Sequence, residues 1–233
     1  MQQARIGHSF WVMFISPLGT LDSLRERPRW IYAVLLSAII SVAANSYIIE
    51  RIGFVRLIES TFRAKAVIDP QGAMENALAH KGQILCFQAI ATFVSPFFIA
   101  LVTATVLWLL LTLFGHDLPF KKSLAVVAHA NMLSIILREC MIVLTASIIR
   151  DAGAFNLRNP LATNIAFFLH PASPSLFRAL ASLDVITFMN MALLITGLTR
   201  VCARLSVKAA SMIVVIPWAI YVGATLLIPP SLS

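Results

Sequence analysis

Residues 30–49 read WIYAVLLSAIISVAANSYII, a run of 20 residues without a charged side chain. At about 1.5 Å per residue, a helix of this length spans the roughly 30 Å hydrocarbon core of a bilayer. The run is preceded by Arg27, Pro28 and Arg29, and proline is favourable in a first helical turn because its missing N–H has no helical acceptor there. This stretch predicts a membrane-spanning helix and so decides the class of fold.

The composition of the whole chain agrees with a membrane protein. Of 233 residues, 59% are hydrophobic and 12% are charged, whereas an average soluble domain is about half apolar and about a quarter charged. The net charge of +8 would suggest nucleic-acid binding in a soluble domain. Here the basic residues cluster between apolar runs, which is typical of segments that orient a membrane protein and contact anionic lipid head groups. We therefore expect the lipid bilayer, and not nucleic acid, around this chain.

Three more apolar runs predict spans of their own. The longest, residues 84–114, has 31 residues without a charge, which fits one tilted helix passing through Pro96 better than two full spans. The expected fold is an all-α integral membrane protein, a bundle of five transmembrane helices with short amphipathic segments. A cytoplasmic segment at 1–29 precedes a membrane domain at 30–233, with spans at about 30–49, 84–114, 124–149, 174–204 and 209–228.

The prediction of the fourth span depends on a helix-start signal. The uncharged run 185–199 has only 15 residues, which is short of the roughly 17 to 25 that a spanning helix needs. Ser173 followed by Pro174 is an N-cap serine with proline at the first helical position. A continuous helix from Pro174 to about Arg204 then places Asp184 inside the membrane.

Two segments outside the spans have an amphipathic pattern. Phe54, Ile58 and Phe62 recur at helical spacing, and Asp69 with Pro70 predicts the start of another short helix. Residues 9–25 have a similar pattern. Both segments can be interfacial helices on the membrane surface or helical extensions of neighbouring spans, and the second interpretation is preferred.

An intramembrane polar cluster is the candidate site. Arg138 and Glu139 lie near the middle of the third span, where a charge costs several kcal/mol unless it is paired or faces water. Arg138 and Asp184 lie at similar depths, roughly 15 Å from the same end of their helices. We predict an Arg138–Asp184 ion pair, with Asn131 on the polar face of the third span and Asn190 as a further polar neighbour. The preferred role is to fix helix register; the alternative is transport or proton relay.

Chemical motifs give no support for catalysis. The five histidines are scattered, without H-x-x-x-H or a carboxylate at ligand spacing. The sequence contains no G-x-S-x-G, H-E-x-x-H or Walker motif. We expect no enzyme activity, no cofactor and no metal site.

The distribution of Lys and Arg predicts the orientation. With the N-terminus inside, nine basic residues fall in short cytoplasmic segments and eight in two longer outer loops. Small residues repeat every four positions, as in Ala33, Ser37 and Ser41, or Ala219 and Gly223. Such repeats allow close helix contact, within one chain or, less favoured, in a homo-oligomer.

The chain also resembles bacterial members of the Yip domain (Ypt-interacting protein) family. The resemblance covers nearly its whole length and rests on SPLGTL at 16–21 and LRERPRW at 24–30, PFKKSLAVVA at 119–128, and LDVIT at 183–187 followed by LLITGL at 193–198. The chain departs from the family pattern at His129 and Met132, where an aromatic and a proline are common, and at Met189, where tryptophan is common.

This resemblance implies a five-span fold with a cytoplasmic N-terminus in the bacterial inner membrane, and no enzyme activity. Eukaryotic relatives act in membrane traffic with small GTPases, whereas the resemblance implies for bacterial members loosely defined membrane roles, which include association with ABC-type exporters. The leading hypothesis is therefore a non-enzymatic membrane scaffold or accessory subunit that packs against other membrane proteins, an ABC exporter among them. The rival is a small transporter, channel or lipid-handling protein that uses the cluster around Arg138. A water-accessible cavity at that depth would favour the rival.

Overall fold

The chain is an all-α integral membrane protein. A computed structural model describes residues 16–64, 69–151, 155–157, 159–169, 171 and 173–227. Within these ranges the helices are α2 (Pro17–Ser23), α3 (Ile31–Ile52), α4 (Phe54–Ala64), α5 (Pro70–Ala79), α6 (Lys81–Leu113), α7 (Phe120–Ile148), α8 (Ile165–Leu169), α9 (Pro174–Ser182), α10 (Val185–Val201) and α11 (Val207–Leu227).

Four of these helices are long and apolar enough to cross a membrane, namely α3, α6, α7 and α11. Each agrees within a few residues with a span predicted from the sequence. The run around Pro96 is one helix of 33 residues, as expected. The fifth apolar helix, α10, has 17 residues and a length of about 25 Å.

The prediction of a continuous helix over 174–204 is wrong. The helix is interrupted at Leu183 and Asp184, so that α9 ends at Ser182 and α10 begins at Val185. Leu183 has φ −83° and ψ 70°, outside the helical region. The backbone N–H of Val185 donates to the Thr163 carbonyl at 3.0 Å, and that of Ile165 donates to the Leu183 carbonyl at 3.4 Å. The polypeptide before α8 thus replaces helical hydrogen bonds at the break, and both α9 and α10 pack against α11.

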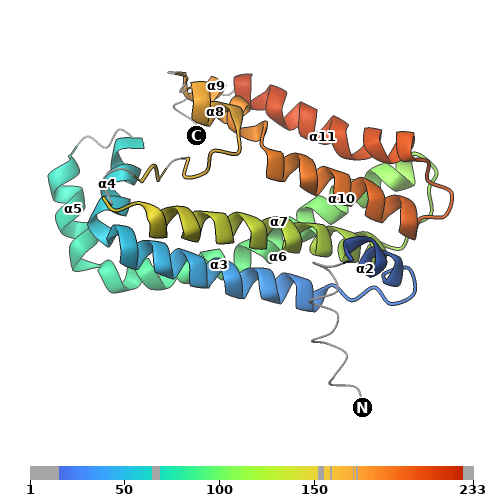
Figure 1. The fold of residues 1–233 in the computed structure, drawn as a ribbon, viewed down its shortest axis with the longest axis horizontal. Helices are drawn as coiled ribbons and strands as arrows, with labels where there is room; N and C mark the ends of the chain where they lie inside the picture. Colours follow the sequence, from blue (N-terminus) through green and yellow to red (C-terminus); the bar gives the residue numbers. More distant parts are fainter. Residues whose placement is uncertain are drawn as a thin grey trace, which may run out of the picture.

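Helix α7 is the centre of the bundle. It packs against α3, α6 and α10, and Figure 1 shows it between α3 on one side and α10 with α11 on the other, while α6 crosses behind it. Its run 124–132 is buried on every side. Small residues allow this, because Ala125, Ala128 and Ala130 are at most 1% exposed and let three neighbouring helices approach.

The two ends of the bundle differ. At the distal end, where α3 and α7 end and α6 begins, Gly53 adopts φ 94°, a conformation that favours glycine and separates α4 from α3. Helix α4 is therefore not an extension of the first span. The N-terminal cap of α5 is Asp69, which accepts from the Gly72 N–H at 3.0 Å as the sequence predicted.

At the proximal end, where α3 and α7 begin, α2 packs on α10. Leu21 of α2 and its C-cap Leu24 are at most 2% exposed, and Arg200 of α10 forms an ion pair with Asp22. Within the amphipathic segment predicted over 9–25, one face with Thr20, Leu21 and Leu24 thus packs against the bundle, while residues 9–15 lie outside the described ranges.

Candidate functional site: a polar pocket between the spans

Four of the five predicted site residues line one cavity of about 390 Å³, which we call the Arg138 pocket. Its walls come from α7, from the break between α9 and α10, and from the irregular segment before α8. The polar side chains around it are those of Asn131, Ser134, Arg138, Asn159, Asn164, Asp184, Thr187 and Asn190. The fifth predicted residue, Glu139, is half-buried beside Arg138 but does not line the pocket.

Asp184 is the N-cap of α10 and does not pair with Arg138. One carboxylate oxygen accepts from the Ile186 N–H at 2.7 Å, and the other accepts from the Thr163 hydroxyl at 2.7 Å. Both residues of the predicted ion pair are described, and no ion pair within 4 Å joins them. The prediction of this ion pair is wrong because the helix break turns the carboxylate toward the backbone of its own helix and toward Thr163.

Arg138 gives the pocket its positive charge. It lies ten residues before the end of α7 at Ile148, about 15 Å along the helix. Its side chain is exposed to the pocket, and no ion pair to Arg138 within 4 Å occurs among the described residues. A charge at this depth is costly unless a partner or water compensates for it. Arg138 and the Asp184 carboxylate line the same pocket, which is therefore suited to water and, beside Arg138, to an anionic group.

Asn131 and Asn190 join α7 to α10 across the pocket wall. Asn190 Nδ2 donates to Asn131 Oδ1 at 3.1 Å. Asn131 is only 9% exposed, yet its Nδ2 has no partner in the described chain, and neither has Asn190 Oδ1. Because buried polar groups are normally hydrogen-bonded, these two atoms offer one donor and one acceptor to water or a ligand.

The segment before α8 supplies the residues that the sequence analysis missed. Asn159 and Asn164 exchange amide hydrogen bonds of 3.0 and 2.8 Å, and Asn164 Oδ1 also accepts from the Phe167 N–H at 3.0 Å to begin α8. Both amides are about 6% exposed. Irregular backbone near membrane depth is tolerated where it lines a cavity. The recurrence of asparagine at 156, 159 and 164 between apolar residues was the available signal.

Metal binding has no support in the described ranges, where no group of three or more His, Cys, Asp or Glu side chains could hold an ion. Comparisons with protein-family models, curated proteins and solved structures find no match to this chain. The Yip resemblance therefore stays a prediction.

Proposed function

We propose that this protein is a small transporter or lipid-handling protein that binds an anionic group of its solute in the Arg138 pocket, without a catalytic step. The observation that supports the proposal is the pocket itself. It combines an arginine that has no ion-pair partner in the described chain with a buried amide donor that lacks an acceptor.

The break between α9 and α10 supports the same proposal. Interrupted membrane helices are the way many transporters expose backbone groups and helix ends to a solute. Here the N-terminus of α10 faces the pocket, although Asp184 already neutralises part of its positive end. Arg138 therefore carries the attraction for the anion, and the asparagine amides orient it.

The test is ligand binding by the protein in lipid nanodiscs. A panel of small carboxylates and phosphates, with matched amines as negative controls, is screened by thermal unfolding and then by calorimetry. Loss of a charge-assisted hydrogen bond, worth about 1.5–3 kcal/mol, should weaken binding about 10- to 100-fold in Arg138→Gln. Arg138→Lys should retain part of the affinity. Arg150→Gln, at an exposed residue outside the pocket, is the control and should bind as the parent does.

The accessory-subunit hypothesis predicts a different result. Helix α6 presents large apolar side chains outward, among them Phe87, Phe98 and Leu113 at 74%, 65% and 78% exposure. This surface suits lipid chains as well as a partner helix. Co-purification from native membranes in mild detergent distinguishes the accessory subunit from the transporter or lipid-handling protein. A stoichiometric exporter permease and ATPase would support the accessory role.

The proposed setting is the bacterial inner membrane with the N-terminus in the cytoplasm. In that orientation the distal end of the bundle faces outward. Cysteine labelling of residues on the two ends of the bundle in intact cells tests this orientation.

A further inference from the structure

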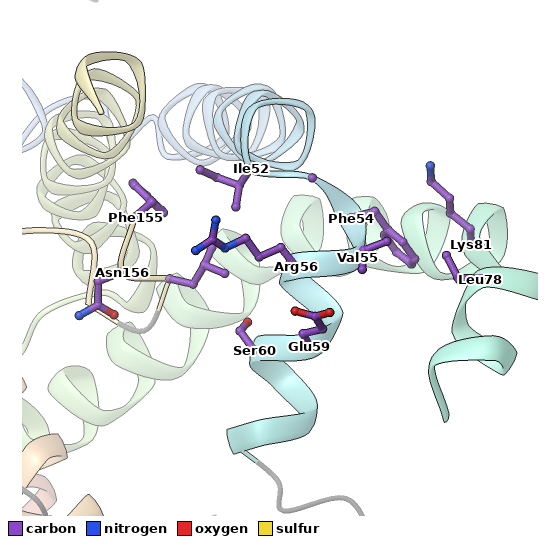
Figure 2. A pocket seen from close by; sticks show the side chains of 12 residues that line it. Ile52, Phe54, Val55, Arg56, Glu59, Ser60, Leu78, Lys81, Phe155 and Asn156 are labelled. Atoms are coloured by element: carbon purple, nitrogen blue, oxygen red, sulfur yellow. The ribbon is translucent and has the colours of Figure 1, made fainter. Parts of the chain in front are cut away.

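A second cavity of about 790 Å³ lies at the distal end, where α4 meets the start of α6 and residues 155–157. We call it the Arg56 pocket. Figure 2 shows the Arg56 side chain reaching from α4 toward Phe155, while Lys81 stands on the other side. The pocket is independent of the Arg138 pocket, with which it shares no lining residue.

The charges around the Arg56 pocket favour an anion. Among the described residues that line it, the charged side chains are those of Arg56, Lys81 and Glu59. No ion pair within 4 Å involves either cation in the described part of the chain. The Lys81 ammonium lies 5.6 Å from the centre of the Phe54 ring, a contact that positions this cation without neutralising it. The Ser60 and Asn156 side chains also line the pocket, and the Ser60 hydroxyl donates to the Leu57 carbonyl of its own helix at 2.8 Å.

The same cavity has an apolar rim. Val55 and Leu78 line it and are 45% and 47% exposed. Helix α4 is amphipathic, and it leaves the end of a spanning helix at Gly53, which is the position of a helix that lies in the membrane interface. Cations beside exposed apolar residues at this level face the region where lipid phosphates and the first acyl carbons meet.

We infer that the Arg56 pocket binds the phosphodiester of an anionic membrane phospholipid, with an acyl chain along Val55 and Leu78. Arg56 contacts the phosphate oxygens, and Lys81 adds a second positive charge. Arginine suits this role because its planar guanidinium matches two phosphate oxygens at once. Two cations and one carboxylate leave an excess positive charge, which selects phosphatidylglycerol over zwitterionic phosphatidylcholine.

The experiment counts lipids retained by the full-length protein. Nanodiscs contain phosphatidylcholine with or without phosphatidylglycerol, and native mass spectrometry of the released protein measures the bound phosphatidylglycerol. A basic residue near a membrane surface contributes enough to change affinity about fivefold. Arg56→Gln and Lys81→Gln should each weaken retention by about that factor. The control Arg150→Gln removes an exposed charge at the same end but outside the pocket and should retain lipid as the parent does.

Further measurements distinguish the lipid site from a general surface charge effect, a free phosphate and the Arg138 pocket. Equal losses in Arg56→Gln and Arg150→Gln would overturn the site in favour of a general surface charge effect. Competition by inorganic phosphate or glycerol phosphate as strong as that by the lipid would overturn the lipid assignment in favour of a free phosphate. If Arg56→Gln lowers the unfolding midpoint, the lipid retention of Arg56→Lys is measured in its place, and this variant must retain most of the lipid. Arg138→Gln must leave phosphatidylglycerol retention unchanged, because a loss there would assign the lipid to the other pocket.

Discussion

Substitution of Arg138 and Asp184, singly and together, distinguishes the observed pocket from an ion pair. Asp184→Ala removes the N-cap of α10, worth about 1 kcal/mol, and the hydrogen bond from the Thr163 hydroxyl, worth about 1.5 kcal/mol to a charged acceptor. We therefore expect the free energy of unfolding to fall by about 2–3 kcal/mol. Asp184→Asn keeps an oxygen that accepts from the Ile186 N–H, so it should lower the free energy of unfolding by less than Asp184→Ala does.

Arg138→Gln should raise the free energy of unfolding or leave it unchanged. No ion pair is lost, and a charge in the hydrocarbon core costs about 2.5–3.5 kcal/mol on insertion scales, so its removal leaves the free energy of unfolding unchanged or raises it. Because no ion pair joins them but they line one pocket, the effects of Arg138→Gln and Asp184→Ala should couple by no more than about 1 kcal/mol. Equilibrium unfolding in mixed micelles, followed by circular dichroism, provides the measurement. A destabilised Arg138→Gln that Asp184→Ala rescues would refute this reasoning, because breaking one partner of a buried pair costs about 3–5 kcal/mol.

Further predictions concern packing and a buried hydrogen bond. A Cβ at Gly197 would lie 2.6 Å from a Val126 methyl where α10 meets α7, so Gly197→Ala should cost about 1–3 kcal/mol by overpacking; Gly223→Ala, with no atom within 4 Å, should stabilise α11 by a few tenths to about 1 kcal/mol. Thermal unfolding of the two variants in one detergent makes this comparison. Tyr32→Phe should cost about 1–2 kcal/mol, because the His129 Nδ1 donates to a carbonyl and leaves Nε2 as an acceptor for the Tyr32 hydroxyl. The same substitution in a His129→Leu background should cost less, and an equal cost in both backgrounds would count against the bond.

Local sequence patterns predicted most of the bundle. Charge-free length placed α3, α6 and α11, and a long apolar run interrupted by Arg138 and Glu139 placed α7. A helix satisfies its own backbone hydrogen bonds in lipid, so such runs predict helices. The Ser173–Pro174 and Asp69–Pro70 signals marked helix starts because capping depends on adjacent residues. Small residues at 33, 37 and 41 were expected at a helix contact, and all three are buried in α3, whereas Ala219 and Gly223 are exposed.

The candidate site was predicted only in part. Arg138, Asp184, Asn131 and Asn190 were predicted to lie near one another from their depths along the helices, and all four line one cavity. The partner of Asp184 could not be predicted, because Thr163 lies 21 residues away in a segment without helical periodicity. That hydrogen bond, with the backbone pairing beside it, breaks the predicted fourth span and leaves Arg138 facing the pocket. Non-local hydrogen bonds of this kind carry no periodic signal in one sequence.

The most direct test of anion binding in the Arg138 pocket is whether a small anion reaches it. Thr187, which lines it, is replaced by cysteine in a protein whose native Cys86, Cys140 and Cys202 are serines. Anionic and cationic methanethiosulfonate reagents are then compared, with exposed Ser147→Cys and fully buried Leu198→Cys as positive and negative controls. We expect Thr187→Cys to react faster with the anionic reagent, and Arg138→Gln to abolish that preference. A Thr187→Cys protein as unreactive as Leu198→Cys, or one with no charge preference, would contradict the account.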